Sequence, residues 1–269
     1  MENQQSAIKR SPFVSGQKDA AGLLLELVDR EPERYALFLD IDGTLLDLAE
    51  SPDGIRVPSG LADDLATVSA RMGGALALVT GRALTYADRL FAPHRFPIAG
   101  LHGTERRDAS GAIIRSESSA AFLAVKEDLP RLQQAWPGVL VEDKGAAIAV
   151  HYRQAPDCAD VVQQAMADAM AAVGPGYELQ TGKMVVEIRP DSADKGRALQ
   201  AYLSEPTFRD RVAIAIGDDV TDEAMFECVN RLGGLSFRVG DLDGSLARQS
   251  LNNPQVLRDT LSTLARRGQ

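Results

Sequence analysis

The spacing of apolar and polar residues predicts an α/β fold for the first part of the chain. Nearly unbroken apolar runs at 35–41, 74–79 and 97–101 are typical of strands buried on both faces of a parallel sheet. Residues 59–71 show a helical pattern, and a second helix is expected after Arg82. This β-α-β-α-β order predicts a parallel sheet with right-handed crossovers.

Local signals refine the first elements and the edge of this sheet. Residues 1–17 are expected to form a mobile tail, and 19–31 an amphipathic helix that packs on the body. Ser59 is the expected N-cap of the helix that follows it. Residues 106–115, with a turn at their centre, predict a hairpin.

The middle of the chain has a different pattern, with short strands paired as hairpins. The expected elements are helices over 119–135 and 157–172 and strands over 138–142, 146–152, 177–180 and 184–188. Hairpin strands with interposed helices predict a small α+β unit built on an antiparallel sheet.

The α/β pattern returns after Arg189-Pro190. A helix, a strand, a helix and a strand are expected in turn at 194–203, 212–216, 221–229 and 235–239. The predicted fold class is therefore α/β, a Rossmann-like parallel-sheet core with an inserted α+β cap. The predicted division is a tail and helix over 1–33, a core over 34–116 and 190–269, and a cap over 117–189.

Composition and charge exclude several classes of protein. Hydrophobic residues make up 45% of the 269 positions, which is enough for a sizeable core. The net charge of -9 and the pI of about 4.9 argue against nucleic-acid and anionic-membrane partners, which need a basic surface. No apolar run reaches the length of a membrane span, about 18 residues, and residues 1–13 do not resemble a signal peptide. Cys158 and Cys228 form neither a disulfide framework nor a zinc pattern, so a cytoplasmic location is expected.

The most informative segment is DIDGTL, at 40–45, which follows the first predicted strand. Side chains at i and i+2 of a strand point the same way, so Asp40 and Asp42 are expected to share one site. Two crowded carboxylates are unfavourable unless a cation or a shared proton compensates. The segment therefore predicts a metal-assisted site at the carboxyl edge of the sheet; the alternative is a strand followed by an Asp-Gly turn.

Three more segments fit the same site, because open α/β sheets bind ligands beyond the carboxyl ends of their strands. They contribute Thr80, Gly81 and Arg82 after the second strand, Lys195 at the start of a helix, and Asp218, Asp219 and Asp222 after a later strand. Phosphoryl transfer needs a nucleophile, hydroxyl and amide donors and a cation, and Mg2+ prefers carboxylates, water and phosphate oxygens. The set predicts a magnesium phosphotransfer centre.

Taken in order, these motifs resemble those of the haloacid-dehalogenase (HAD) superfamily of aspartyl-phosphate phosphatases. Further segments are similar to the bacterial trehalose-6-phosphate phosphatases: LHGTERRD at 101–108, VEDKG at 141–145, GKMVVE at 182–187, GDDVTDE at 217–223 and NRLGG at 230–234. The resemblance covers about residues 34 to 266. It implies Mg2+-dependent hydrolysis of trehalose 6-phosphate to trehalose and phosphate; a monomer is expected, with this sugar phosphate as its partner.

The resemblance implies how the reaction proceeds. Asp40 would be the nucleophile that forms the aspartyl-phosphate, and also a metal ligand. Asp42 would protonate the sugar leaving group and then activate water, while its backbone carbonyl contacts the metal. Asp218 would be a further ligand of Mg2+.

The remaining core residues would bind the phosphate or support the metal. The resemblance assigns phosphate binding to Thr80, Gly81 and Lys195, and support of the metal to Asp219 and Asp222. Thr80 stands where many members carry serine, but either hydroxyl can donate to a phosphate oxygen.

The predicted cap carries three charged residues that the family uses to bind the sugar. Glu142, Lys144 and Glu187 match positions that hydrogen-bond the disaccharide hydroxyls, which both donate and accept. The alternative for each is a solvated charge on a loop.

Three other residues are also candidates. His102 and Glu105 follow a core strand and could face the cleft, although His102 could instead be a structural histidine. Arg82 could reach the cleft or cap its own helix.

Other functions remain open on the same residues. One is a different HAD sugar-phosphate phosphatase, of the sucrose-phosphate or mannosylphosphoglycerate type. Another is a phosphomutase, which also uses Asp-x-Asp. A non-catalytic sugar-phosphate sensor is the third, although a sensor has no need of a nucleophile.

Overall fold

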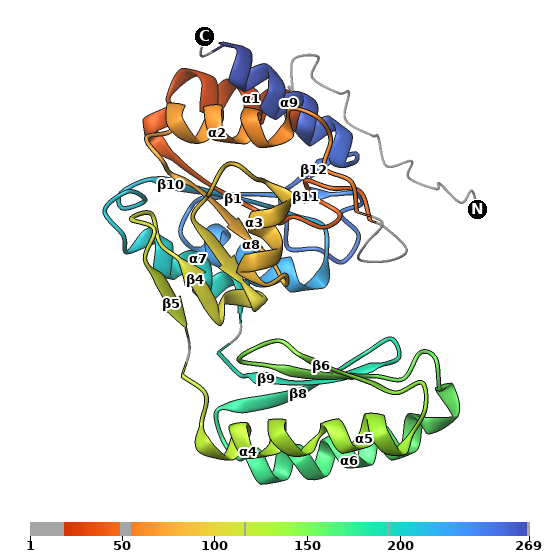
Figure 1. The fold of residues 1–269 in the computed structure, drawn as a ribbon. Coiled ribbons are helices and arrows are strands. Elements are labelled where there is room, and N and C mark those ends of the chain that lie inside the picture. The colour runs from red at the N-terminus through yellow and green to blue at the C-terminus, as the bar shows by residue number, and fades with distance from the viewer. Residues whose placement is uncertain (1–18, 49–54, 116, 193, 268–269) are drawn as a thin grey trace, which may run out of the picture.

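The computed structural model describes residues 19–48, 55–115, 117–192 and 194–267 (Figure 1), so the predicted tail over 1–17 lies outside the described residues. The larger of its two sheets has the strands β1 (Tyr35–Leu39), β2 (Leu76–Val79), β3 (Ile98–Gly100), β4 (Glu105–Arg107), β5 (Ile113–Arg115), β10 (Val212–Gly217), β11 (Leu235–Val239) and β12 (Gln249–Leu251). Their spatial order is β12-β11-β10-β1-β2-β3-β4-β5. Pairs from β12 to β3 are parallel, and β3, β4 and β5 pair antiparallel.

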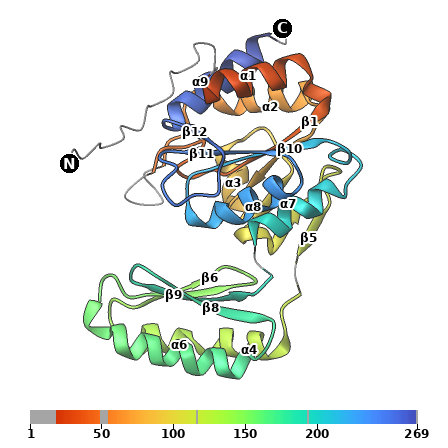
Figure 2. The same ribbon diagram turned by 180° about the vertical axis from the view of Figure 1, so that it is seen from behind.

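Helices lie on both faces of this sheet (Figures 1 and 2). The helices of this part are α1 (Ala20–Arg30), α2 (Leu61–Arg71), α3 (Leu84–Leu90), α7 (Lys195–Leu203), α8 (Glu223–Arg231) and α9 (Pro254–Arg267). Strand β1 explains the two layers, because Leu37 and Leu39 join the core beneath α1, α2 and α9. Its alternate residues Ala36 and Phe38 join the core beneath α7 and α8. A strand buried on both faces places its carboxyl end, and the residues that follow it, between the two helical layers.

The smaller sheet and its helices form the cap. They are β6 (Leu140–Asp143), β7 (Ile148–His151), β8 (Tyr177–Gly182), β9 (Val185–Pro190), α4 (Ala120–Asp128), α5 (Pro130–Ala135) and α6 (Ala159–Val173). The strand order is β6-β7-β9-β8, and each neighbouring pair is antiparallel. Both views show the cap helices on the side of this sheet away from the core, so its other face is turned toward the core (Figures 1 and 2).

Most predicted elements agree with the structure. The single helix over 119–135 is wrong, because Pro130 has no N–H to donate and instead begins α5. The N-cap Ser59 is also wrong: Gly60, with a φ of 82°, takes that position, and no side chain caps α2. No element was predicted beyond residue 239, where β12 and α9 lie.

Short 3-10 helices complete the fold and matter for the site. They are η1 (Pro32–Arg34), η3 (Leu101–Gly103), η4 (Pro156–Cys158) and η5 (Val220–Asp222). The predicted helix over 221–229 is thus a 3-10 turn followed by α8, which extends to Arg231.

Candidate active site

Three buried charged side chains meet at the carboxyl ends of β1 and β10. Asp40 follows β1, and its backbone N–H donates to the carbonyl of Ile216 at 3.0 Å. Its Oδ1 lies 2.9 Å from Nζ of Lys195, and the same Nζ donates to Oδ1 of Asp222 at 2.7 Å. Only 6%, 3% and 0% of the Asp40, Lys195 and Asp222 side chains are exposed. Because an ammonium has three N–H groups, Lys195 keeps one for a further acceptor.

Burial and neighbouring charges set the protonation of this cluster. Burial raises the pKa of Asp40 to about 8, against the attraction of Lys195. Burial likewise raises the pKa of Asp218 to about 6, and the charge of Asp222 adds to the effect. For Lys195, burial would lower the pKa, but the charges of Asp40 and Asp222 outweigh it and raise the pKa above its usual value. The lysine therefore stays cationic and Asp218 is mostly ionised at neutral pH, whereas Asp40 needs a further positive charge to ionise readily there.

The Gly-Thr pair after Asp42 is explained by contact with Asp218. Thr44 Oγ1 donates to Oδ1 of Asp218 at 2.8 Å. Gly43 has a φ of +80°, and a Cβ on it would lie 2.1 Å from Oδ2 of Asp218. Only glycine fits this close approach. No role for Thr44 is predicted from the sequence, although this residue stands inside the motif.

Asp222 holds the turn that presents Asp218. Its Oδ2 accepts from the backbone N–H of Asp218 at 2.9 Å and of Asp219 at 3.0 Å, and its Oδ1 binds Lys195. A Cβ on Gly217 would lie 2.2 Å from the Asp222 carboxyl carbon. Asp219 is exposed and stands at the N-cap position of η5, where its carbonyl accepts from the backbone N–H of Asp222 at 3.0 Å. Asp222 therefore orients both the ammonium and the Asp218 backbone.

The carboxylates are grouped closely enough to hold a metal ion. Single oxygens of Asp40, Asp218 and Asp222 lie within 4.8 Å of one another. Hard carboxylate oxygens suit Mg2+. Both oxygens of Asp222 are already engaged, so Asp40 and Asp218 fit direct ligation better, and Asp222 fits a supporting role.

Asp42 is held apart from this cluster by Arg82. The guanidinium Nε donates to Oδ2 at 2.8 Å and Nη2 donates to Oδ1 at 2.9 Å. The same guanidinium lies over the Tyr86 ring, 4.8 Å from its centroid, and its hydrogen bond to Asp42 raises the pKa of Arg82. The two aspartates of the motif are thus at one end of β1, but each is paired with a different cation. The Arg82 side chain thus reaches the carboxyl end of β1.

Thr80 and Gly81 lie beside His102. The hydroxyl of Thr80 accepts from the backbone N–H of Arg82 at 3.1 Å, which leaves its own proton free to donate. The backbone N–H of His102 donates to the Thr80 carbonyl at 3.0 Å, and a Cβ on Gly81 would lie 2.8 Å from the His102 imidazole. His102 has a φ of 55°, and its buried Nδ1 has no hydrogen-bond partner among the described residues. Burial lowers the pKa of His102 to about 3, so the ring is neutral.

Glu105 has a local role in the structure. Its Oε1 accepts from the backbone N–H of Leu84 at 2.6 Å, at the start of α3, and its Oε2 lies 3.5 Å from Nε of Arg115. These contacts tie the edge of the sheet to α3, and they do not join Glu105 to the carboxylate cluster.

A row of polar side chains crosses the cap sheet. Glu142 on β6 and Glu187 on β9 both pair in register with Ala149 on β7, and Gln180 on β8 pairs with Glu187. Residues opposite one another on neighbouring strands share a face. The residues that flank Ala149 pack beneath the cap helices, so the row lies on the face turned toward the core. No local signal in the sequence marks Gln180, because only the strand register brings it into the row.

The charged residues of this face are paired with one another. Lys144 Nζ donates to Oε2 of Glu187 at 2.7 Å, and Nε2 of His151 lies 2.9 Å from Oε2 of Glu142. The contact with His151 lowers the pKa of Glu142. Glu142 also raises the pKa of Arg82, by less than Asp42 does. The cap carboxylate therefore lies within electrostatic reach of the core.

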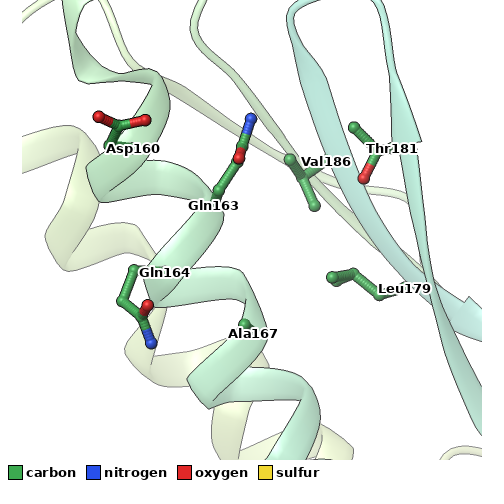
Figure 3. A pocket seen from close by; sticks show the side chains of 7 residues that line it. All are labelled: Asp160, Gln163, Gln164, Ala167, Leu179, Thr181 and Val186. Carbon is green, nitrogen blue, oxygen red and sulfur yellow. The ribbon is translucent and has the colours of Figure 1, made fainter.

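Two cavities differ in how they relate to these residues. One of about 260 Å3 is lined by His102 and Lys195 of the core together with Gln180 and Arg189 of the cap. The other, of about 490 Å3, lies between α6 and the edge strand β8, and Figure 3 shows its lining side chains. The second cavity contains none of the predicted site residues, whereas the first joins His102 and Lys195 of the core to the cap sheet.

Known proteins are similar to this chain over most of its length. A family model described as trehalose-phosphatase matches residues 38–256. A probable trehalose-phosphate phosphatase of Sinorhizobium fredii is 53% identical over 90% of this chain and 91% of its own length. The trehalose-6-phosphate phosphatase of Escherichia coli K12 is 41% identical over 77% of this chain and 78% of its own length.

Solved structures share the fold at lower identity. The C-terminal domain of the Candida albicans trehalose-6-phosphate phosphatase has a TM-score of 0.73 and 22% identity, with 91% of this chain and 96% of that chain covered. A phosphatase of the HAD superfamily from Bacteroides thetaiotaomicron has a TM-score of 0.59 and 16% identity, with 93% and 99% covered. The predicted fold class, an α/β parallel-sheet core with an inserted α+β cap, is confirmed. On the family match and the identity to its relatives, this chain belongs to the trehalose-phosphatase family.

Proposed function

We propose that this chain hydrolyses trehalose 6-phosphate to trehalose and phosphate, with Mg2+ bound and with an aspartyl-phosphate formed on Asp40. One observation carries the proposal: the buried carboxylate of Asp40 contacts Lys195 and lies within 4.8 Å of an oxygen of Asp218. A carboxylate that is oriented and shielded from water is suited to act as a nucleophile. Membership of the family and the names of the relatives from S. fredii and E. coli supply the substrate.

The chemistry consists of two substitutions at phosphorus. An Asp40 oxygen forms a bond to phosphorus as the bond to the sugar oxygen breaks, and Asp42 gives that oxygen a proton. Water then attacks the same phosphorus, loses a proton to Asp42 and releases Asp40 as a carboxylate. Arg82 holds both Asp42 oxygens in the structure, so it must give up at least one contact when Asp42 acts as an acid.

The phosphate would be held from two sides of the carboxyl edge. Thr80, which follows β2, has a free hydroxyl proton. Lys195, which begins α7, has one unused N–H, and both groups lie at this edge. Gly81 lets the His102 imidazole lie close beside them, because a Cβ on residue 81 would be 2.8 Å from the ring. When bound by Asp40, the Asp42 carbonyl and Asp218, Mg2+ would neutralise charge on the phosphate oxygens.

The cap would bind the disaccharide. Glu142, Lys144 and Glu187 present carboxylates and an ammonium on the sheet face turned toward the core, and Gln180 continues the row. Sugar hydroxyls both donate and accept, so a row of mixed charge and amide groups can satisfy them. Closure of the cap would also exclude bulk water from the phosphoryl group.

The remaining expectations are part of the same proposal. The described segments contain no helix that is both long and apolar enough to span a membrane. The proposed enzyme is a cytoplasmic monomer that acts on a small sugar phosphate and does not bind nucleic acid; the net charge of -9 supports the last point.

The decisive experiment is phosphate release from trehalose 6-phosphate beside glucose 6-phosphate and sucrose 6-phosphate, with Mg2+ and with a chelator. We expect Mg2+-dependent release that strongly favours trehalose 6-phosphate, and no release by the Asp40→Asn variant. Faster turnover of sucrose 6-phosphate would favour a phosphatase of the sucrose-phosphate type. Phosphate that appears on a second sugar hydroxyl, and not in water, would identify a phosphomutase.

A further inference from the structure

The turn between β6 and β7 carries one of the proposed sugar-binding residues and is tightly organised. We call residues 143–147 the β6–β7 turn. The backbone N–H of Lys144 donates to the carbonyl of Ala147 at 3.0 Å, and that of Gly145 donates to Oδ1 of Asp143 at 2.7 Å. Gly145 has a φ of +80°, a conformation that glycine adopts without strain. The side chain of Lys144 leaves this turn to reach Glu187.

A lysine of α4 fastens this turn to the helical layer. Nζ of Lys126 donates to the carbonyl oxygen of Gly145 at 2.8 Å and lies 2.6 Å from Oδ1 of Asp143. Only 19% of the Lys126 side chain is exposed. Burial opposes ionisation of Asp143, but the hydrogen bond from Lys126 and the backbone N–H of Gly145 outweigh it and lower the pKa of Asp143.

The two lysines at this end of the cap have separate partners. Lys126 binds the turn itself, while Lys144 binds Glu187 on the neighbouring strand β9. Asp143 and Gly145 flank Lys144 in the turn, and Lys126 contacts both. Lys126 therefore fixes the backbone from which the Lys144 side chain reaches Glu187.

We propose that Lys126 is a positioning residue for substrate binding, which acts on the sugar only through the β6–β7 turn and Lys144. The inference rests on the proposed function of the cap row. Ordering a turn before the ligand arrives removes an entropic cost from binding. Loss of Lys126 should therefore raise KM for the sugar phosphate more than it lowers kcat.

The test uses the full chain, three single variants, and Lys144→Met with and without Lys126→Met. Lys126→Met keeps the apolar stem and removes the ammonium, and Lys126→Arg keeps a cation that can bind both acceptors. The matched control is Arg131→Met, which breaks the ion pair of Arg131 with Asp128 on the cap helices. Initial rates are measured on trehalose 6-phosphate and on p-nitrophenyl phosphate, which offers no sugar, and thermal unfolding is followed for each variant.

We expect Lys126→Met to lose about tenfold in kcat/KM on trehalose 6-phosphate, mainly through KM, as befits the loss of hydrogen bonds to a charged group. The rate on p-nitrophenyl phosphate should change less than about twofold, Lys126→Arg should recover most of the loss, and Arg131→Met should behave as wild type. In Lys144→Met, the further change Lys126→Met should cost little, because its target is gone.

The outcomes separate this inference from the proposed function. If wild type does not hydrolyse trehalose 6-phosphate, the proposed function is wrong. Suppose that wild type is active and Lys144→Met is impaired. The positioning role is then wrong if Lys126→Met matches wild type, and also if Lys126→Met adds a full independent loss to that of Lys144→Met. An equal loss on both substrates, with a lowered unfolding temperature, would also overturn it in favour of a purely structural role.

Discussion

Thr44 Oγ1 donates a hydrogen bond of 2.8 Å to Asp218 Oδ1, and this bond joins two loops 174 positions apart in the chain. Thr44 is fully buried, and the carboxylate it contacts is a proposed ligand of Mg2+. A ligand carboxylate is oriented by such a partner, because the donor fixes which lone pairs remain for the metal.

Thr44→Val should weaken Mg2+ activation by about tenfold or more, since loss of a hydrogen bond to a ligand typically costs that much in metal affinity. Valine keeps the shape and removes only the donor. Thr44→Ser should stay close to wild type. The measurement is the Mg2+ concentration that gives half-maximal activity. An unchanged value in the valine variant would remove Thr44 from this role.

Asp42→Asn should reduce turnover of trehalose 6-phosphate by about 10²- to 10⁴-fold, because it removes the acid that protonates the sugar oxygen. The loss should be much smaller with p-nitrophenyl phosphate, whose leaving group needs no proton. Steady-state rates on the two substrates check this. Equal losses on both would show that Asp42 is not the general acid.

In chelator, the stability of the protein should depend on pH through Asp218. Its pKa in the folded state is raised by burial to about 6, from 3.8. Between these values the folded state keeps a proton that the unfolded state has released, so the free energy of unfolding falls as pH rises through this window. Asp40, with a pKa of about 8, adds a fall of the same sign that extends to higher pH.

Asp218→Asn should remove its part of this dependence. Urea unfolding of both proteins at about pH 4.5 and pH 6.5 gives the comparison. Wild type should lose more stability than the variant over this interval, and Mg2+ should oppose the loss in wild type by favouring the ionised carboxylate. Identical pH dependence of the two proteins would contradict the raised pKa.

Glu187→Ala should lower kcat/KM on trehalose 6-phosphate by a factor that corresponds to about 1–3 kcal/mol of lost binding. The change removes a proposed sugar partner and leaves Lys144 without its hydrogen bond. Hydrolysis of p-nitrophenyl phosphate should change much less. Parallel rate measurements on the two substrates decide the matter. A uniform loss would assign Glu187 to the fold or the chemistry, and no loss on either would make it a solvated charge.

The sequence by itself determined those features that depend on near neighbours in the chain. The apolar run of β1 predicts a strand buried on both faces, because alternate side chains have no polar side to expose. The spacing of Asp40 and Asp42 places both at one end of that strand, and the motifs around Thr80, Lys195 and Asp218 indicate the same edge. The helix break at Pro130 was missed, although its cause is local.

Only the tertiary structure decided which of these groups touch. Whether Asp42 meets Arg82 or the Asp40 cluster depends on the path of the chain after β2, which no local pattern encodes. The row from Glu142 to Gln180 depends on the register of four cap strands, and a shift of one residue would turn a strand's side chains to the other face. Side-chain period is a property of a single strand, whereas partner and register arise from packing of the whole domain.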